Sequence, residues 1–195
     1  LGGDGLSDTC AQAAGGPGRF NDLQIALDSL VSGDTLFVHP GDYFRVGDSF
    51  RVGGIGSPDA PIVVTAADRT DLPTIHSWDP EDPSNNALSH AALTAREEPV
   101  GHIVLDHLSI DGLLAMSGDH IRVQNVVCTH GWEVCDGNWS CLRLEYCTDC
   151  VAHHNLVHDV FDSTGHCTEY EPREAGFKEF DGVRNIWELN TVVNT

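Results

Sequence analysis

The sequence predicts an all-β fold in which short parallel strands stack as the turns of a solenoid. Four segments share one pattern, in which two apolar runs flank a turn position, and those positions are Leu108, Asn125, Asn155 and Asn190. The apolar runs are rich in Val, Ile and Leu, whereas helical periodicity is confined to the first 30 residues. A strand motif that recurs at uneven spacing is typical of a solenoid whose length differences lie in loops.

Asn125, Asn155 and Asn190 occupy the same place in three of these turns. Parallel strands about 4.8 Å apart arrange equivalent side chains in columns along the coil. We therefore expect the three amides to form a ladder inside one corner, each bonding its neighbours and the backbone of the bend.

The chain is expected to form a single domain, residues 1–195, with three parts in order. Residues 1–19 are rich in Gly, Ala and Asp and predict an irregular lead-in. Residues 20–32 predict an amphipathic helix that caps the first turn, with Asn21 as its N-cap and Gly33 beyond its end. Residues 33–195 are predicted to form the turns of the coil.

Three stretches break the repeat and are expected to bulge out as loops: residues 77–96, 131–140 and 162–175. The second and third contain Cys135 and Cys167, which we expect to pin them to the coil through disulfides. Loops on a rigid scaffold often carry binding and catalysis, so these two predict one wall of a groove.

Several phrases resemble one family. Residues 33–44, GDTLFVHPGDYF, and residues 56–75, GSPDAPIVVTAADRTDLPTI, are similar to the first turns of the pectate-lyase-like superfamily. The resemblance is particularly to extracellular polysaccharide lyases of the alginate lyase and chondroitinase B type, and it extends to the later turns. It implies a single-stranded right-handed parallel β-helix. Because this superfamily also contains hydrolases, epimerases, adhesins and structural shafts, it does not by itself imply one activity.

The chain is strongly acidic, with 30 acidic and 10 basic residues and a formal net charge of −20. Such a surface repels phosphate backbones and anionic membranes, so we expect no nucleic-acid partner. No apolar run is long enough to span a bilayer, and we expect no membrane insertion. The acidic surface is explained either by solvation alone or by binding of divalent cations.

The chain has seven cysteines. Most of them are clustered between Cys128 and Cys167, which indicates an oxidising compartment and a secreted protein, either extracellular or periplasmic. Six cysteines allow about fifteen pairings, and the sequence does not choose among them. Cys147 and Cys150 have the spacing of a zinc-binding pair, but disulfides are favoured because no second such pair accompanies them.

Aligning the turns on their asparagines brings Leu142 level with Phe177 and Arg143 level with Lys178. If the first pair points into the core, the cationic pair points outward on one face. The resemblance to lyases implies that Lys178, with Arg143 beside it, removes the proton next to a uronate carboxylate. It also implies a Ca²⁺ ion that neutralises this carboxylate. The candidate calcium ligands are Glu169, Glu171, Glu174 and Asp181.

The function expected from these features is β-elimination on an acidic polysaccharide or cell-surface glycan. The alternative is a non-catalytic extracellular module for structure, adhesion or filaments, in which Lys178 pairs with a neighbouring carboxylate. His158, which the alignment brings level with Cys128, offers a further site beside Asp159. The sequence shows no cap after its last strand, so we expect another chain or further turns to cover that end.

Overall fold

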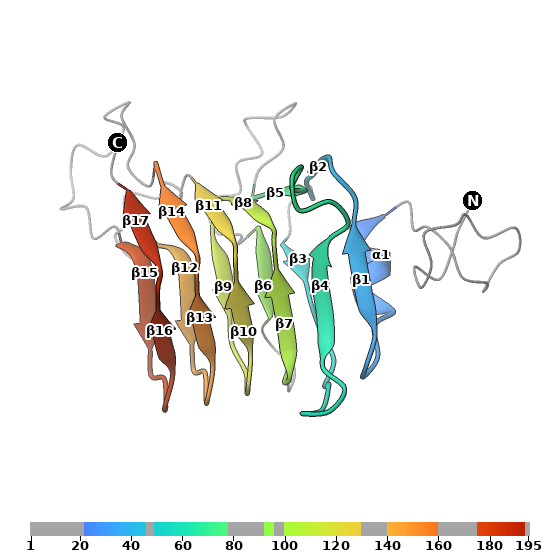
Figure 1. Cartoon of the computed structure of the whole chain (residues 1–195). Coiled ribbons are helices and arrows are strands. Elements are labelled where there is room, and N and C mark those ends of the chain that lie inside the picture. Colours follow the sequence, from blue (N-terminus) through green and yellow to red (C-terminus); the bar gives the residue numbers. More distant parts are fainter. Residues whose placement is uncertain are drawn as a thin grey trace, which may run out of the picture.

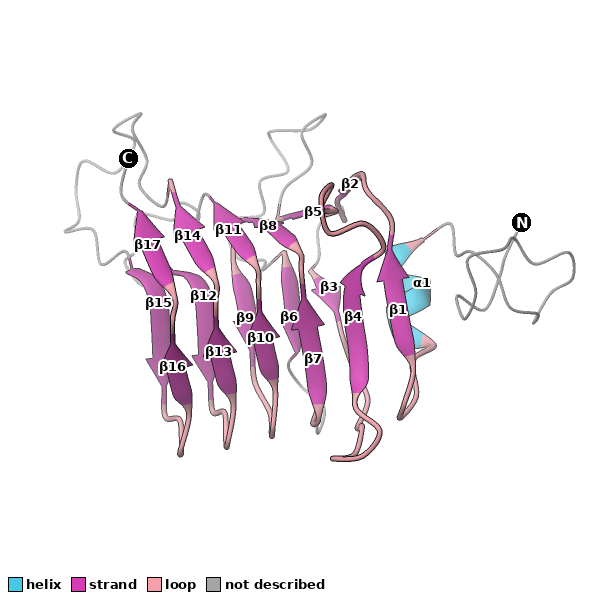
Figure 2. Ribbon diagram, in the orientation of Figure 1, coloured by secondary structure: helices cyan, strands magenta, loops and turns pink. Residues whose placement is uncertain are grey.

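The computed structural model describes residues 22–45, 49–77, 92–95, 100–129, 140–159 and 175–193. In this part of the chain, one short helix precedes seventeen strands that form three parallel sheets (Figure 1). Each complete turn of the coil contributes one strand to each sheet. The fold is therefore a parallel β-helix, as the sequence predicts, and strands dominate its ribbon (Figure 2).

The sheets are here named A, B and C. Sheet A contains β1 (Thr35–Val38), β4 (Ile62–Ala66), β7 (Ile103–Asp106), β10 (Arg122–Gln124), β13 (Val151–His153) and β16 (Ile186–Glu188). Sheet B contains β2 (Asp42–Tyr43), β5 (Thr74–His76), β8 (Ser109–Asp111), β11 (Val127–Thr129), β14 (Leu156–His158) and β17 (Thr191–Val193). Sheet C contains β3 (Phe50–Arg51), β6 (Leu93–Ala95), β9 (Leu114–Met116), β12 (Ser140–Glu145) and β15 (Ala175–Phe180).

The core is built from aliphatic columns that all three sheets send into the coil. Alternate residues of each strand point inward, so equivalent residues of successive turns stack directly on each other. Fully buried members that pair in register are Leu105 and Val123 in sheet A, Ile110 and Cys128 in sheet B, and Leu114 and Leu142 in sheet C.

Left-handed residues turn the chain at its corners. The corner between sheets A and B has His107, Asn125, His154 and Leu189 at φ between +53° and +55°. A single residue in this conformation redirects the backbone without a longer loop, and Asn tolerates it better than most side chains. The corners are therefore short and stack in columns like the strands.

The asparagine ladder contains Asn155 and Asn190, and the prediction that Asn125 is its third member is wrong. Val127 pairs with Leu156, so Asn155 is level with Val126, while Asn125 lies one residue earlier at the left-handed corner. Asn155 Nδ2 and backbone N–H both donate to Asn190 Oδ1 at 3.0 Å. The offset between these turns is one residue shorter than an alignment of asparagines implies.

The same one-residue offset corrects a second expectation. His158 is level with Thr129 and not with Cys128. Cys128 instead forms a disulfide with Cys141, which links β11 to β12. The proposed column of His158 and Cys128 does not exist.

The single helix described, α1 (Leu23–Asp28), lies at the β1 end of the stack (Figure 1). Its N-cap is Asp22, whose side chain accepts hydrogen bonds from two backbone N–H groups, so the expected Asn21 is wrong by one residue. Leu23, Ala26 and Leu27 are buried in the core. The helix is shorter than the predicted residues 20–32, because it ends at Asp28 with Ser29 as its C-cap, and Gly33, at φ +92°, lies in the turn that follows.

Cys147 and Cys150 are buried free thiols, so neither forms one of the disulfides that were favoured over a zinc site. Their side chains hydrogen-bond to each other, and this contact together with burial raises the pKa of Cys147. Its Sγ also lies 3.3 Å from the carbonyl oxygen of Met116. Cys10, Cys135 and Cys167 lie outside the described residues.

The last described turn exposes apolar side chains at the end of the stack. Ile186, Leu189 and Val192 are 50%, 71% and 51% exposed. That another chain or further turns cover this end stays a prediction. Among the residues described, there is no helix with the length and apolar character needed to cross a membrane.

Candidate functional site

The outer face of β12 and β15 brings the predicted cations together. Arg143 pairs with Lys178 in register, and Leu142 pairs with Phe177, as the alignment predicted. Leu142 is fully buried and Phe177 packs against the core. Because neighbouring residues of a strand point to opposite faces, Arg143 and Lys178 project outward from adjacent turns.

Two further residues complete this patch, which we name the sheet C patch: Arg143, Glu145, Lys178 and Phe180. Glu145 pairs with Phe180, so the four residues form a two-by-two array. Arg143 Nη1 donates to Glu145 Oε1 at 2.8 Å. The Phe180 ring lies beneath both cations, with its centroid 5.6 Å from Arg143 Cζ and 5.2 Å from Lys178 Nζ.

The sheet C patch can bind an anion and accept a proton. The aromatic ring holds both cationic groups by cation–π attraction, and the four residues together carry one net positive charge. A planar guanidinium matches a carboxylate with two hydrogen bonds, while the amine of Lys178 can act as a base only after its ammonium form has lost a proton. These are the two groups that proton removal beside a carboxylate requires.

The predicted calcium ligands are represented here by a single residue. Asp181 follows β15 at an exposed left-handed corner, with φ +46°. Glu169, Glu171 and Glu174 lie outside the described residues. Ca²⁺ takes six to eight oxygen ligands, so Asp181 suits the ion by its chemistry but cannot hold it alone.

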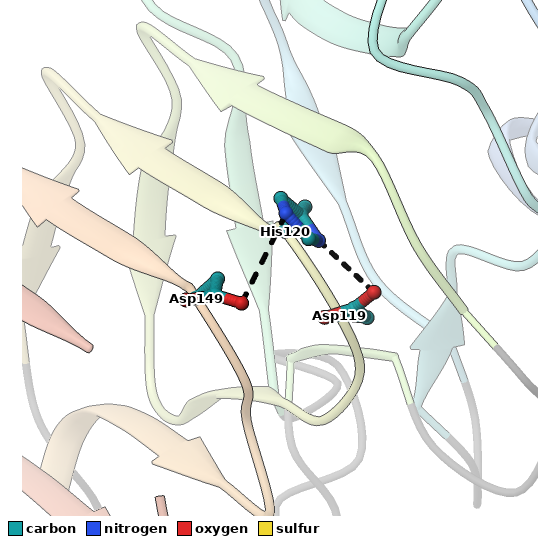
Figure 3. A group of neighbouring side chains, drawn as sticks. All are labelled: Asp119, His120 and Asp149. Carbon is teal, nitrogen blue, oxygen red and sulfur yellow. Dashed lines mark ion pairs between the residues drawn. The ribbon is translucent and has the colours of Figure 1, made fainter. Parts of the chain in front are cut away.

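Another group of potential metal ligands lies between sheets C and A: Asp119, His120 and Asp149 (Figure 3). His120 Nδ1 is 2.9 Å from Asp119 Oδ2, and its Nε2 is 4.0 Å from Asp149 Oδ2. Arg184 donates to both oxygens of Asp149 and lowers the pKa of that carboxyl. Because the guanidinium occupies this carboxylate, a cation there must displace it.

Sequence reasoning missed this group, although a signal for it exists. Its residues belong to a corner column in which His102, His120, Asp149 and Arg184 are all left-handed. Each follows a residue bridged to its equivalent in the next turn. Polar residues one or two positions before successive sheet A strands were the signal.

A buried carboxylate beside sheet A collects hydrogen bonds from three turns. Asp106 is 5% exposed. Burial raises the pKa of this carboxyl, but hydrogen bonds more than offset that effect and lower it. Its oxygens accept from side chains of His107, Gln124 and Asn125 at 2.7, 3.1 and 2.9 Å, and of Thr65 and Arg69 at 3.3 and 3.4 Å.

His76 in sheet B bridges two carboxylates. Its Nδ1 lies 2.7 Å from Asp111 Oδ2 and its Nε2 lies 2.9 Å from Asp42 Oδ1. Ionised carboxylates only accept hydrogen bonds, so the protonated ring, which carries hydrogen on both nitrogens, can donate to both of them. The hydrogen bond to Asp111 raises the pKa of His76, Asp42 adds to this, and burial opposes it.

Comparison with known proteins reveals the fold alone. No protein-family model and no curated protein matches this sequence. The crystal structure of alginate lyase from Paenibacillus sp. str. FPU-7 is similar, with a TM-score of 0.55 and 11% identity over 87% of this chain and 63% of that chain. This likeness supports the parallel β-helix fold.

A rhamnogalacturonan lyase also matches, with a TM-score of 0.43 and 14% identity over 92% of this chain and 48% of that chain. The chain thus spans less than two thirds of either solved structure. At these identities, the likeness assigns no residue a role.

Proposed function

We propose that this chain is a secreted protein that cleaves a uronate-containing polysaccharide by β-elimination at the sheet C patch. The observation that carries the proposal is the register of β12 and β15, which sets Arg143 beside Lys178 on one outer face. The fold shared with an alginate lyase supports it. An extracellular or periplasmic location is supported by the Cys128–Cys141 disulfide, since such bonds persist in oxidising compartments.

In the proposed reaction, Arg143 binds the uronate carboxylate and Lys178 takes the proton from the adjacent ring carbon. The electron pair left on that carbon forms the new ring double bond and expels the glycosidic oxygen, which takes a proton from water. Arg143 stabilises the negative charge that grows on the carboxylate oxygens. The acidic polysaccharide is the proposed partner.

Calcium is proposed as the cofactor, held by Asp181 together with Glu169, Glu171 and Glu174. When bound, Ca²⁺ would neutralise the substrate carboxylate and so make the neighbouring proton more acidic. The chain's own part is to supply hard oxygen ligands on the turn of Lys178.

The test measures the ultraviolet absorbance of unsaturated uronate products. Wild type and Lys178→Ala are incubated with alginate, pectate and chondroitin sulfate, each with calcium and with a chelator. We expect one substrate to give product with wild type in calcium and a rate lower by about a thousandfold in the variant. No product from any substrate, or an undiminished rate in Lys178→Ala, contradicts the proposal.

A non-catalytic structural or adhesion module is the second candidate, favoured by the apolar side chains exposed on the last described turn. Burying such a surface against a second copy or further turns would be favourable. Light scattering across a concentration series distinguishes the candidates. Concentration-dependent assembly without product formation favours the module, whereas a monomer that forms product excludes it.

A further inference from the structure

A chain of hydrogen bonds leads from buried Asp106 to the surface along sheet A. Asp106, Gln124 and His153 are paired in register on successive strands β7, β10 and β13. Gln124 Nε2 lies 3.1 Å from Asp106 Oδ1, and Gln124 Oε1 lies 2.9 Å from His153 Nε2. His153 Nδ1 lies 2.8 Å from Nδ1 of His154, the corner residue that follows β13.

The direction of each hydrogen bond follows from the carboxylate. Ionised Asp106 can only accept, so the amide nitrogen of Gln124 must face it and the amide oxygen must face His153. Nε2 of His153 therefore carries the hydrogen. In a neutral ring the lone pair is then at Nδ1, and it accepts from Nδ1–H of His154.

His153 is surrounded by groups that favour its neutral form. Burial lowers the pKa of His153, and the neighbouring His154 and positively charged Arg122 lower it further, against Glu188 and Asp106. With His153 neutral and accepting, the remaining lone pair of a neutral His154 is at Nε2. His154 is exposed, at a left-handed corner with φ +55°.

The same outer face offers an aromatic side chain and a cation. Phe37 is 59% exposed and begins the column that continues through Thr65 to Asp106. Arg122 is exposed two residues before Gln124. The strands of this face lie side by side in Figure 1. Strand spacing of about 4.8 Å is comparable to the length of one sugar unit along an extended glycan.

We propose that the outer face of sheet A is a second glycan-binding surface, in which His154 Nε2 accepts a hydrogen bond from a sugar hydroxyl. Arg122 contacts a uronate carboxylate and Phe37 packs against a sugar ring. The inference rests on the proposed function for the class of ligand, an acidic polysaccharide, but the binding surface does not require that the protein cleave this ligand. Asp106, Gln124 and His153 are positioning residues that fix the acceptor before the ligand arrives, which lowers the entropic cost of binding.

The first experiment reads the ring tautomers by nitrogen-15 NMR of the imidazoles at neutral pH. We expect His153 to be the Nε2–H tautomer and His154 the Nδ1–H tautomer in wild type. Gln124→Leu should leave both rings as mixtures, and His153→Phe should release His154 in the same way if the first variant does not fold. His107→Ala is the matched control, because it removes a donor to Asp106 outside the chain of bonds. Mixed tautomers in wild type overturn the proposal.

The second experiment adds short oligosaccharides of mannuronate, galacturonate or chondroitin to wild type. We expect at least one to shift His154 Nε2 saturably, and His154→Ala to weaken its affinity about tenfold. No saturable shift with any of the three overturns this inference, even if the lyase assay succeeds. A shift without product from any polymer supports it while contradicting the proposed cleavage, so the two failures are distinguishable.

Discussion

The outer faces of sheets A and C are built from similar strands but treat charge in opposite ways. On sheet A, one buried carboxylate accepts from five side chains, so its charge is compensated inside the protein. On sheet C, Arg143 and Lys178 lie over one aromatic ring with Glu145 beside Arg143, so two cations share a face with one carboxylate. The hydrogen bonds to Asp106 hold three turns together, whereas the cations Arg143 and Lys178 are suited to attract a ligand of opposite charge.

The largest effect is expected from removing the compensated charge. Asp106→Ala leaves five donors without their acceptor in three turns, and we expect it to lower the free energy of unfolding by about 3–5 kcal/mol. Urea unfolding measures this loss. The exposed Asp59→Ala is the control and should cost about 1 kcal/mol or less. Glu145→Ala removes a single acceptor from Arg143, in a pair whose side chains are 11% and 13% exposed, and should cost less than Asp106→Ala. Equal losses at Asp106 and Glu145 would remove the distinction between the two faces.

A smaller loss is expected in the interior of the coil. Asn155 is 2% exposed, accepts from Val126 N–H and donates to the Val123 carbonyl. Asn155→Ala leaves the Val126 N–H without its acceptor and takes one donor from the Val123 carbonyl, so we expect a loss of about 2–3 kcal/mol in the same unfolding experiment. Asn190→Ala, at the more open end of the ladder, should cost less. The reverse order would show that the ladder is not cooperative along the coil.

The pH dependence of stability separates the two kinds of buried charge. The raised pKa of His76 means that its contribution is fully present below its unfolded value of about 6.5 and is lost as pH rises through the folded value. The lowered pKa of Asp106 gives the opposite sign: its contribution is present above about pH 4 and is lost as pH falls further.

Melting temperatures across the pH range test these signs. His76→Gln should remove the decline of the melting temperature on the alkaline side and leave the acid side unchanged. Asp106→Asn should flatten the acid side only. If His76→Gln keeps the alkaline decline, the imidazole between Asp42 and Asp111 is not the cation inferred from its contacts.

Removing the disulfide between β11 and β12 should lower the free energy of unfolding by about as much as removing Asn155. The bond joins residues 13 apart in sequence, and closing a loop of this size in the unfolded chain stabilises a protein by about 2–3 kcal/mol. The double variant Cys128→Ala with Cys141→Ala should show this loss in urea unfolding. Cys147 and Cys150 are free thiols and give a reductant no further bond to break in the described part of the chain, so a reductant should destabilise wild type more than the double variant.

The fold was predictable because the apolar repeat alone specifies stacked parallel strands. The register of Arg143 and Lys178 was predictable for a related reason: the core residues Leu142 and Phe177 and the ladder of Asn155 and Asn190 share one offset. Asn125 was misplaced because the offset between β11 and β14 is one residue less than the spacing of Asn125 and Asn155. Matching the two asparagines by residue type hid this difference.

The polar networks were not predictable from the same pattern. Asp106 obtains its donors from side chains at corners and on neighbouring turns, and the left-handed conformation of the corner donors His107 and Asn125 is invisible in the apolar periodicity. His120 and Asp149 approach each other only because two corners stack. A register error of one residue is enough to misplace such contacts, and the alignment on asparagines made an error of this size.

If the sheet C patch performs the chemistry, two charge-matched variants should separate Lys178 from another cation of the same turn. Lys178→Met and Arg184→Met each remove one cation from the same turn, but Arg184 bonds Asp149 at a corner. The initial rate of unsaturated product formation is measured on the polysaccharide that wild type cleaves. We predict a rate lower by about a thousandfold for Lys178→Met and within about threefold of wild type for Arg184→Met. Equal rates in the two variants, or no cleavage by wild type, would contradict the claim.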